Sequence, residues 1–179
     1  VGTNVNEQEL GSLIEKARTH DKNALSSLYK DFYPKMVKFM YYRVQEADAE
    51  DLAAEVFIKV LSNIHKQNGS FIPWLYRIAG NVVNDYHRFS RVRKPQPGDK
   101  PSESSLLYTC SPSDQVDRKT DITNALKEIS EDQKELIILK FIQGLSNNDI
   151  AEITGKTPVS IRALQYRALK SLRGVLAVE

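Results

Sequence analysis

The chain has 179 residues, of which 41% are hydrophobic and 27% are charged, and its formal net charge is +2. This balance is typical of a folded globular protein and excludes wholesale disorder. No uninterrupted apolar stretch reaches the roughly 18 residues of a membrane span, which excludes an integral membrane protein. Residues 1–9 lack a secretory pattern and the lone Cys110 cannot form an intrachain disulfide, so we expect a cytoplasmic protein without membrane insertion.

The first half of the chain carries apolar residues at the spacing of α-helices. One weak stripe and three long ones recur, at residues 10–17, 25–40, 52–64 and 71–89. They predict a three- or four-helix bundle over residues 7–93, interrupted by the turn-forming residues 68–70. We expect the large members of the stripes mainly in the core, including Tyr29, Leu61, Trp74, Tyr86 and Phe89.

Residues 94–116 are predicted to be a linker between two modules. Four of the seven prolines fall there, namely Pro95, Pro97, Pro101 and Pro112. Because such a segment buries too little apolar surface to offset the entropy of ordering it, we expect a flexible connection. Cys110 lies in this segment, and an incidental exposed thiol is the favoured interpretation.

The residues from 117 to 175 are predicted to form a second helical module. Apolar residues recur at helical spacing over 122–129, 136–142, 147–153 and 158–172, which indicates four helices. Neither module shows the strict alternation of a half-buried strand. The sequence therefore predicts an all-α protein, with a helical bundle, a flexible linker and a four-helix domain.

The strongest local signal is a helix-turn-helix between residues 145 and 173. Ser146 is typical of a helix N-cap and begins a variant of the capping box. Gly155 supplies the positive φ of a tight turn. Thr157 then caps a new helix that has Pro158 in its first turn, where proline is tolerated. This order of cap, helix, glycine turn and second helix predicts a DNA-binding motif.

The second helix of this motif has two chemically different halves. A rotation of about 100° per residue places aliphatic residues on one half, namely Ile161, Leu164, Ala168, Leu169 and Leu172. The other half carries basic side chains and no acidic one. This suits a helix in the DNA major groove, where arginine pairs with guanine. The predicted contacts are Thr157, Pro158, Ser160, Arg162, Ala163, Tyr166, Arg167 and Lys170. The alternative is a basic helix end that only complements its own dipole.

The near-neutral net charge hides one acidic and two basic segments. Residues 46–55 hold five acids and no base, whereas residues 86–94 and 156–173 hold bases and no acid. This distribution favours a chain that meets a polyanion and a second protein. Helix faces that are merely solvated are the alternative interpretation for each segment taken alone.

Taken together, these segments resemble a bacterial sigma factor of the extracytoplasmic-function type, over both modules. Residues 48–57 resemble the family's region 2.2, and residues 71–81, with Asp85 and Arg88, resemble its promoter-melting and minus-ten-reading regions. Residues 145–173 resemble region 4.2, which reads the minus-thirty-five element. The chain departs from the family pattern at Ala54, Thr154, residues 159–161 and Leu164, and the last two departures alter the reading helix.

The resemblance implies a sigma factor that directs promoter-specific transcription initiation, with core RNA polymerase, promoter DNA and an anti-sigma factor as partners. The polymerase-binding residues would be Asp48, Glu50, Asp51 and Glu55. The minus-ten element would be read by Lys66, Gln67, Asn68, Ser70, Asn81, Asn84, Arg88 and Arg91. The amide and hydroxyl groups among them suit the edge of an unpaired base.

Nothing in the sequence indicates catalysis, and neither a cofactor nor a metal is expected. His20, His65 and His87 have no metal-ligand spacing with one another or with Cys110. Two other functions stay open. One is a helix-turn-helix regulator with a helical sensor or dimerisation domain, which binds duplex DNA without polymerase. The other is an all-helical adaptor that binds only proteins.

Overall fold

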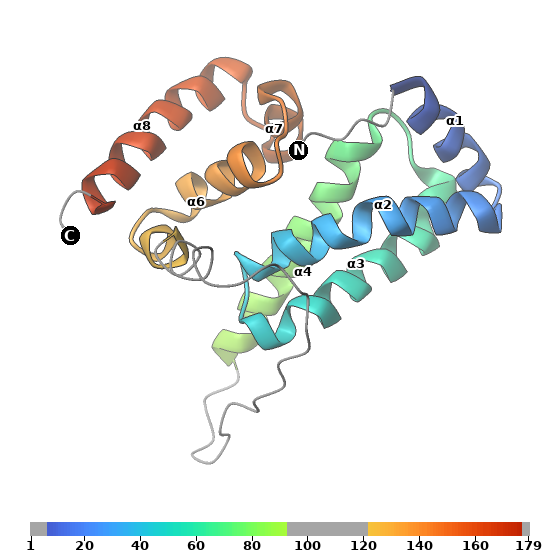
Figure 1. Cartoon of the computed structure of the whole chain (residues 1–179), viewed down its shortest axis with the longest axis horizontal. Helices are drawn as coiled ribbons and strands as arrows, with labels where there is room; N and C mark the ends of the chain where they lie inside the picture. Colours follow the sequence, from blue (N-terminus) through green and yellow to red (C-terminus); the bar gives the residue numbers. More distant parts are fainter. Residues whose placement is uncertain (1–6, 93–121, 177–179) are drawn as a thin grey trace, which may run out of the picture. The chain divides into compact units, whose positions relative to one another are not determined.

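The computed structural model of the chain describes residues 7–92 and 122–176, and within these ranges every regular element is a helix (Figure 1). Two compact units divide the chain, Val1–Asp99 and Lys100–Glu179. The predicted all-α architecture with two helical modules is therefore confirmed. None of the described helices is both long and apolar enough to span a membrane.

Part of the predicted organisation lies outside the described residues. This applies to the linker over 94–116, to both of its boundaries and to Cys110. The predicted limits of the two modules, 7–93 and 117–175, therefore stay predictions.

The N-terminal unit places three long helices around one core. Its elements within residues 7–92 are α1 (Glu7–Arg18), α2 (Lys22–Tyr41), the 3₁₀ turn η1 (Glu46–Asp48), α3 (Ala49–Asn63), the 3₁₀ turn η2 (Ile64–Lys66) and α4 (Phe71–Val92). The helix α3 packs against both α2 and α4, and α1 lies against α2 and η2 (Figure 1). Asp21 begins α2, because its carboxylate accepts a hydrogen bond from the N–H of Ala24 at 2.8 Å.

Aromatic side chains from α2 and α4 form much of this core. Phe32 meets Phe71 edge to face with 5.3 Å between the ring centroids, and Phe39 meets Tyr76 in the same way at 5.5 Å. All four rings are buried. Burial also raises the pKa of Tyr76 far above its ordinary value, because a phenolate would lose its hydration there.

The predicted core stripe is too wide in this unit. The exposed fractions are 45%, 43% and 60% for Tyr29, Leu61 and Phe89. Tyr86 is half-buried. A bundle this small covers only the part of each helix that faces a neighbour, so side chains at the margin of a stripe or near a helix end remain in contact with solvent. Trp74 is half-buried, with its ring centroid 5.8 Å from that of Phe71.

The C-terminal unit stacks short helices beneath one long helix. Residues 122–127 are helical, and they are followed by α6 (Glu131–Ile137), the π-helical turn η3 (Ile138–Ile142), α7 (Asn147–Thr154) and α8 (Pro158–Leu176). The helix α8 packs against α6 and α7. Capping boxes begin α6 at Ser130 and α7 at Ser146, the second of which the sequence predicts.

The apolar run at residues 136–142 changes pitch within the C-terminal unit. The N–H of Gln143 donates to the carbonyl of Ile138 at 2.9 Å, five residues back, which is the π-helical pattern. Gly144 then turns the chain with φ +76°. The widened turn keeps Ile138 and Leu139 fully buried, while Phe141 is 52% exposed.

Candidate nucleic-acid and protein interfaces

The helix-turn-helix forms where the sequence predicts it. The helix α7 ends at Gly155, which has φ +68°, a left-handed conformation that a side chain would strain. The hydroxyl of Thr157 accepts a hydrogen bond from the N–H of Ser160 at 3.2 Å, so Thr157 caps α8. Ile161 then returns to the core and has no exposed surface.

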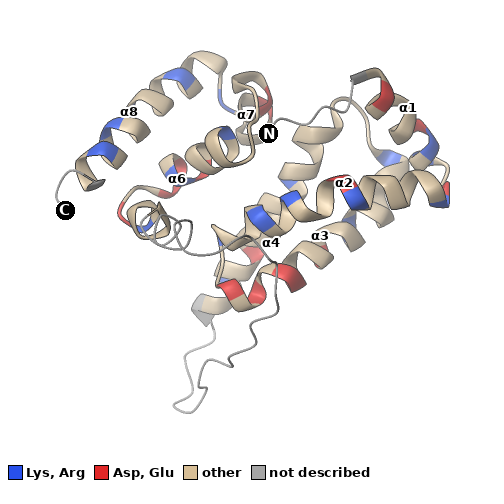
Figure 2. Ribbon diagram, in the orientation of Figure 1, with Lys and Arg blue, Asp and Glu red and all other residues tan. Residues whose placement is uncertain are grey.

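The two faces of α8 separate buried apolar residues from exposed polar ones. Ile161, Leu164 and Ala168 are buried. The eight predicted DNA contacts are all exposed, namely Thr157, Pro158, Ser160, Arg162, Ala163, Tyr166, Arg167 and Lys170. Figure 2 shows lysine and arginine along α8, which has no acidic residue. The prediction is wrong for Leu169, which is 42% exposed, because α6 and α7 cover a narrower arc than half a helix.

Two contacts that sequence reasoning missed hold α8 in place. The side-chain amide of Gln133 at the start of α6 donates to the hydroxyl of Ser171 at 3.2 Å. The amide of Asn147 at the start of α7 donates to the side-chain oxygen of Gln165 at 3.5 Å. Both partners lie on the less exposed side of α8, so they fix its rotation without using the basic face. Because single polar residues at helix starts have no distinctive pattern, the sequence offers no signal for these pairs.

The four predicted DNA contacts between the end of η2 and the start of α4 differ in their exposure. Lys66, Asn68 and Ser70 are exposed. Gln67 is only 2% exposed, so the prediction that its amide faces DNA is wrong. Its side-chain N–H donates to the carbonyl of Gly69 at 2.8 Å, and Gly69 has φ +77°. A buried amide must find hydrogen-bond partners inside the protein, and here it uses them to close the turn.

Arg18 also bonds to Gln67, and no sequence pattern predicts this contact. One guanidinium nitrogen of Arg18, Nη2, donates to both the backbone carbonyl and the side-chain oxygen of Gln67, the latter at 3.0 Å. The other, Nη1, pairs with the exposed carboxylate of Glu15 at 2.7 Å. A basic residue in the last turn of a helix ordinarily complements the helix dipole, so its sequence position does not reveal this contact.

The predicted contacts on α4 share one exposed face. Asn81, Asn84 and Arg88 are all exposed, and their spacing places them on neighbouring turns. Arg88 pairs with Asp85 at 3.0 Å and lies over the ring of Phe89, 5.2 Å from its centroid. The side chain of Arg91 lies outside the described residues.

The acidic segment divides into tied and free carboxylates. Asp48 is half-buried and accepts a hydrogen bond from the hydroxyl of Tyr86 at 2.6 Å. Burial, and then this bond to Asp48, raise the pKa of Tyr86 above its usual value. Glu50 and Asp51 are exposed in the first turn of α3, where acids complement the helix dipole. Glu55 pairs with Lys59 at 2.9 Å.

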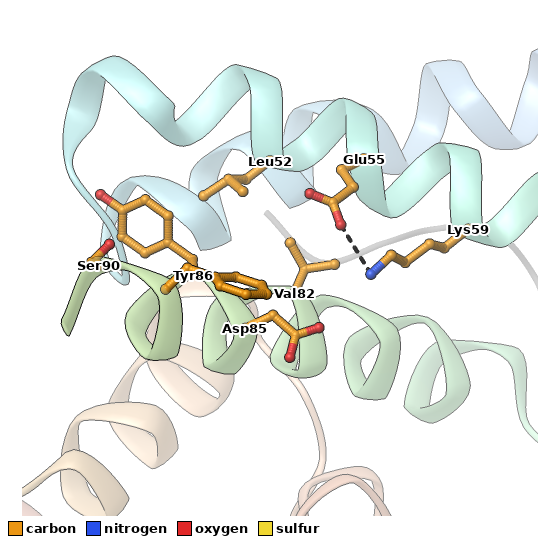
Figure 3. A pocket seen from close by; sticks show the side chains of 8 residues that line it. Leu52, Glu55, Lys59, Val82, Asp85, Tyr86 and Ser90 are labelled. Atoms are coloured by element: carbon orange, nitrogen blue, oxygen red, sulfur yellow. Dashed lines mark ion pairs between the residues drawn. The ribbon is translucent and has the colours of Figure 1, made fainter. Parts of the chain in front are cut away.

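A shallow hollow of about 420 Å³ lies between α3 and α4, beside these carboxylates. Figure 3 shows Leu52 of α3 and Val82 of α4 in its lining and the Glu55–Lys59 pair at one edge. The remaining lining residues are Asp85, Tyr86, Phe89 and Ser90. Within the described ranges, no three side chains of the His, Cys, Asp or Glu type gather closely enough to hold a metal ion.

Comparison with known proteins shows the family. The profile of sigma-70 region 2 matches residues 28–92, and that of sigma-70 region 4 matches residues 119–172. The chain is 32% identical to the ECF RNA polymerase sigma factor BldN of Streptomyces coelicolor, over 92% of this chain and 64% of that one. It is 31% identical to the ECF RNA polymerase sigma factor SigX of Bacillus subtilis, over 82% of this chain and 80% of SigX.

The fold agrees with these matches. The sigma factor RpoE of Bartonella quintana, solved with the anti-sigma factor NepR, superposes with a TM-score of 0.66 at 23% identity, over 89% of this chain and 99% of RpoE. The chain therefore belongs to the sigma-70 family, in its extracytoplasmic-function group. Sigma factors are transcription initiation factors and not enzymes. The region 2 match covers most of the N-terminal unit. In the two alternative functions, this unit would be a sensor, dimerisation or adaptor domain instead.

Proposed function

We propose that this chain binds core RNA polymerase and reads a promoter at two places. The C-terminal unit reads the minus-thirty-five duplex with α8, and the N-terminal unit reads the minus-ten element with the turn after η2 and the exposed face of α4. The observation that carries the proposal is the division of α8 into a buried apolar face and an exposed basic face without acids.

The exposed face of α8 has the chemistry of duplex recognition. Arg162 and Arg167 offer the planar fork that pairs with the O6 and N7 atoms of guanine. Lys170 and Arg173 lie toward the end of the helix and suit phosphate oxygens, which position a protein without reading sequence. Val159 and Tyr166, 66% and 71% exposed, offer apolar surface that suits a thymine methyl group.

The turn and α4 have the chemistry of single-strand recognition. Asn68 and Ser70 place an amide and a hydroxyl on either side of Gly69, where the backbone bends sharply. Such groups match the Watson–Crick edge of a base that has left the stack. Asn81, Asn84 and Arg88 continue the polar surface along α4, on which the backbone of an opened strand is expected to lie.

The carboxylates in the first two turns of α3 are the proposed contact with polymerase. Glu50 and Asp51 are exposed acids, and Glu55 lies one helical turn further along at the hollow of Figure 3. Clustered acids favour a basic partner and speed its approach. Asp48 contributes in a different way, since its carboxylate is already bonded to Tyr86 and fixes where α3 begins relative to α4.

Run-off transcription with purified core polymerase tests this proposal, on promoter fragments that the holoenzyme selects from the native genome. The wild-type chain is expected to start transcription at defined sites. Arg162→Ala should lower discrimination at one minus-thirty-five base pair by about 1–3 kcal/mol, or roughly 5- to 150-fold.

Arg173→Ala is the matched control, because this exposed arginine lies near the end of α8. It should weaken binding to all fragments alike and reduce the dependence of binding on salt. Duplex binding without initiation would contradict the proposal, as would an Arg162→Ala variant with the promoter preference of the wild type.

An anti-sigma factor is proposed as a further partner, acting in the cytoplasm where transcription takes place. The exposed acids of α3 and the hollow beside them give such a protein a surface that it would share with polymerase. Purification of the tagged chain from its native cells, with and without Glu50→Lys and Asp51→Lys, is the test. A partner that is retained by both forms would contradict a shared surface.

A further inference from the structure

The helix α1 lies upstream of the matched family regions, which begin at residue 28, yet it contacts the proposed minus-ten turn. Arg18 ends α1 and is bonded to Gln67, 49 residues further along the chain. A second contact joins the same two places, since the rings of His20 and His65 lie 6.1 Å apart between centroids. The end of α1 is therefore fastened to the segment that carries the exposed Asn68 and Ser70.

Every polar group of Gln67 is used to define this turn. Its N–H donates to the carbonyl of Ile64 at 3.1 Å, and its side-chain N–H donates to the carbonyl of Gly69 at 2.8 Å. Both of its oxygens accept from Arg18. Because Gln67 lies between α1 and Gly69, the guanidinium and the amide together set the path of the backbone on which Asn68 lies.

The contact has the geometry of a rigid clamp. The planar guanidinium is bonded at both of its ends, through Nη2 to the two oxygens of Gln67 and through Nη1 to Glu15, and a hydrogen bond from a charged donor is about twice as strong as a neutral one. The side chain of Arg18 is 26% exposed and Gln67 is 2% exposed, so water competes little for the bond between them. Lysine at this place would keep the charge but would replace the planar guanidinium with a single, rotatable ammonium nitrogen.

We propose that Arg18 is a positioning residue for minus-ten recognition. It holds the turn so that Asn68 and Ser70 meet the unpaired base, and it does not itself touch DNA. The inference rests on the proposed function, since it assigns to α1 a part in base selection by that same turn. Arg18 thus becomes a specificity-determining residue that acts through Gln67.

The test compares promoter opening by holoenzyme carrying wild-type chain or Arg18→Lys, on fragments that differ by one base in the minus-ten element. Arg18→Lys is expected to reduce discrimination at the base that the turn encloses by about tenfold, the value of one lost charge-assisted bond. Discrimination at other minus-ten positions, binding to the minus-thirty-five duplex and affinity for polymerase should stay within about twofold of wild type.

Glu15→Gln is the matched control, because it removes the negative charge of the exposed partner of Arg18 and leaves the bonds to Gln67 in place. It should have the wild-type profile at every base. Gln67→Glu is the second test variant, since it keeps an acceptor for Arg18 but loses the donor to Gly69. It should lose discrimination at the same base as Arg18→Lys.

A double-mutant cycle separates positioning from general stabilisation. If Arg18 acts through the turn, Arg18→Lys should have little further effect on selection in an Asn68→Ala background. Additive effects of the two changes, or an equal loss at all minus-ten positions, would overturn the inference. Failure of the wild-type holoenzyme to open any promoter would instead overturn the proposed function.

Discussion

The exposed face of α8 and the turn after η2 both present polar side chains to solvent, but the chain places them by different means. On α8, helical geometry alone separates the exposed Arg162 from the buried Ile161 beside it. In the turn, Asn68 follows Gln67, whose side chain is bonded both to Gly69 and to Arg18. Arg18 lies at the end of α1, far away in the sequence but in contact with the turn. One surface is placed by local structure and the other by a long-range contact.

This difference matches the two proposed targets. A duplex offers a regular groove into which a straight helix fits, so a surface with helical periodicity is sufficient. An unpaired base has no fixed partner geometry, and a pocket for it needs groups from several directions. A turn supplies such directions but has few hydrogen bonds of its own, so its shape has to be stabilised by contacts from elsewhere in the fold.

The largest expected effect concerns α8, whose faces are separated by helical geometry alone. Ile161→Ala removes a fully buried side chain and should lower the free energy of unfolding of the C-terminal unit by about 2–5 kcal/mol. Val159→Ala is the control two residues away, where the side chain is 66% exposed, and should change it by less than about 0.5 kcal/mol. Denaturant unfolding followed by circular dichroism measures both. Similar losses of unfolding free energy in the two variants would show that helical periodicity does not separate the faces of α8.

Two glycines allow a direct comparison of the two surfaces. Gly155 and Gly69 have φ of +68° and +77°, and a Cβ at either would meet no atom within 4 Å. Alanine at each should therefore cost about 1–2 kcal/mol of backbone strain alone. Gly69→Ala should also change minus-ten selection in the opening assay, whereas Gly155→Ala should leave it unchanged.

Gly80→Ala is the control for both substitutions, because Gly80 is helical, has ordinary φ and has open space around it. This change should stabilise the chain by up to about 1 kcal/mol. If Gly69→Ala leaves minus-ten selection intact, the backbone shape of this turn does not determine which base is selected.

The smallest expected effect tests whether the acidic surface also depends on a distant contact. Tyr86→Phe removes the bond to Asp48 and should lower the free energy of unfolding by about 1 kcal/mol. Burial and the bond to Asp48 raise the pKa of Tyr86, so its stabilising contribution is complete below pH 10 and is lost as the pH rises through the folded-state value. The difference between wild type and variant should therefore shrink in alkaline solution, measured by denaturant unfolding between about pH 8 and 11.

Tyr166→Phe is the control for this pH series, because the side chain of Tyr166 is 71% exposed. It should leave both the stability and its pH dependence unchanged. A Tyr86→Phe variant that keeps the full alkaline loss of the wild type would show that the bond to Asp48 contributes nothing.

The sequence predicts the fold and the α8 surface well, because both follow from periodicity. Ile161, Leu164 and Ala168 are buried as the rotation along the helix indicates, and Ser146 caps α7. Leu169 is more exposed than predicted. Its exposure depends on how much of α8 the neighbouring helices cover, and the spacing of residues within one helix gives no information on this. The same reason accounts for the exposed Phe89 in α4.

The details of the turn could not be predicted from the sequence. Lys66, Gln67, Asn68 and Ser70 are all polar and adjacent, and nothing in their order marks Gln67 as the buried one. Its buried side chain is bonded to Arg18, and such a pairing of two residues far apart in the sequence leaves no periodic pattern. The tie between Asp48 and Tyr86 escapes prediction for the same reason.

The bond between Arg18 and Gln67 also decides where a working fragment of the N-terminal unit can begin. Truncation at residue 28, where the region 2 match starts, would delete α1 and residues 22–27 of α2. The two oxygens of Gln67 would then lose their hydrogen bonds from Arg18, and the part of α2 that packs against α1 would become exposed to solvent. Expression of this domain for spectroscopy or crystallisation therefore needs a start ahead of Glu7, since a shorter boundary chosen from the family match would yield a unit in which the turn after η2 lacks its contact with α1.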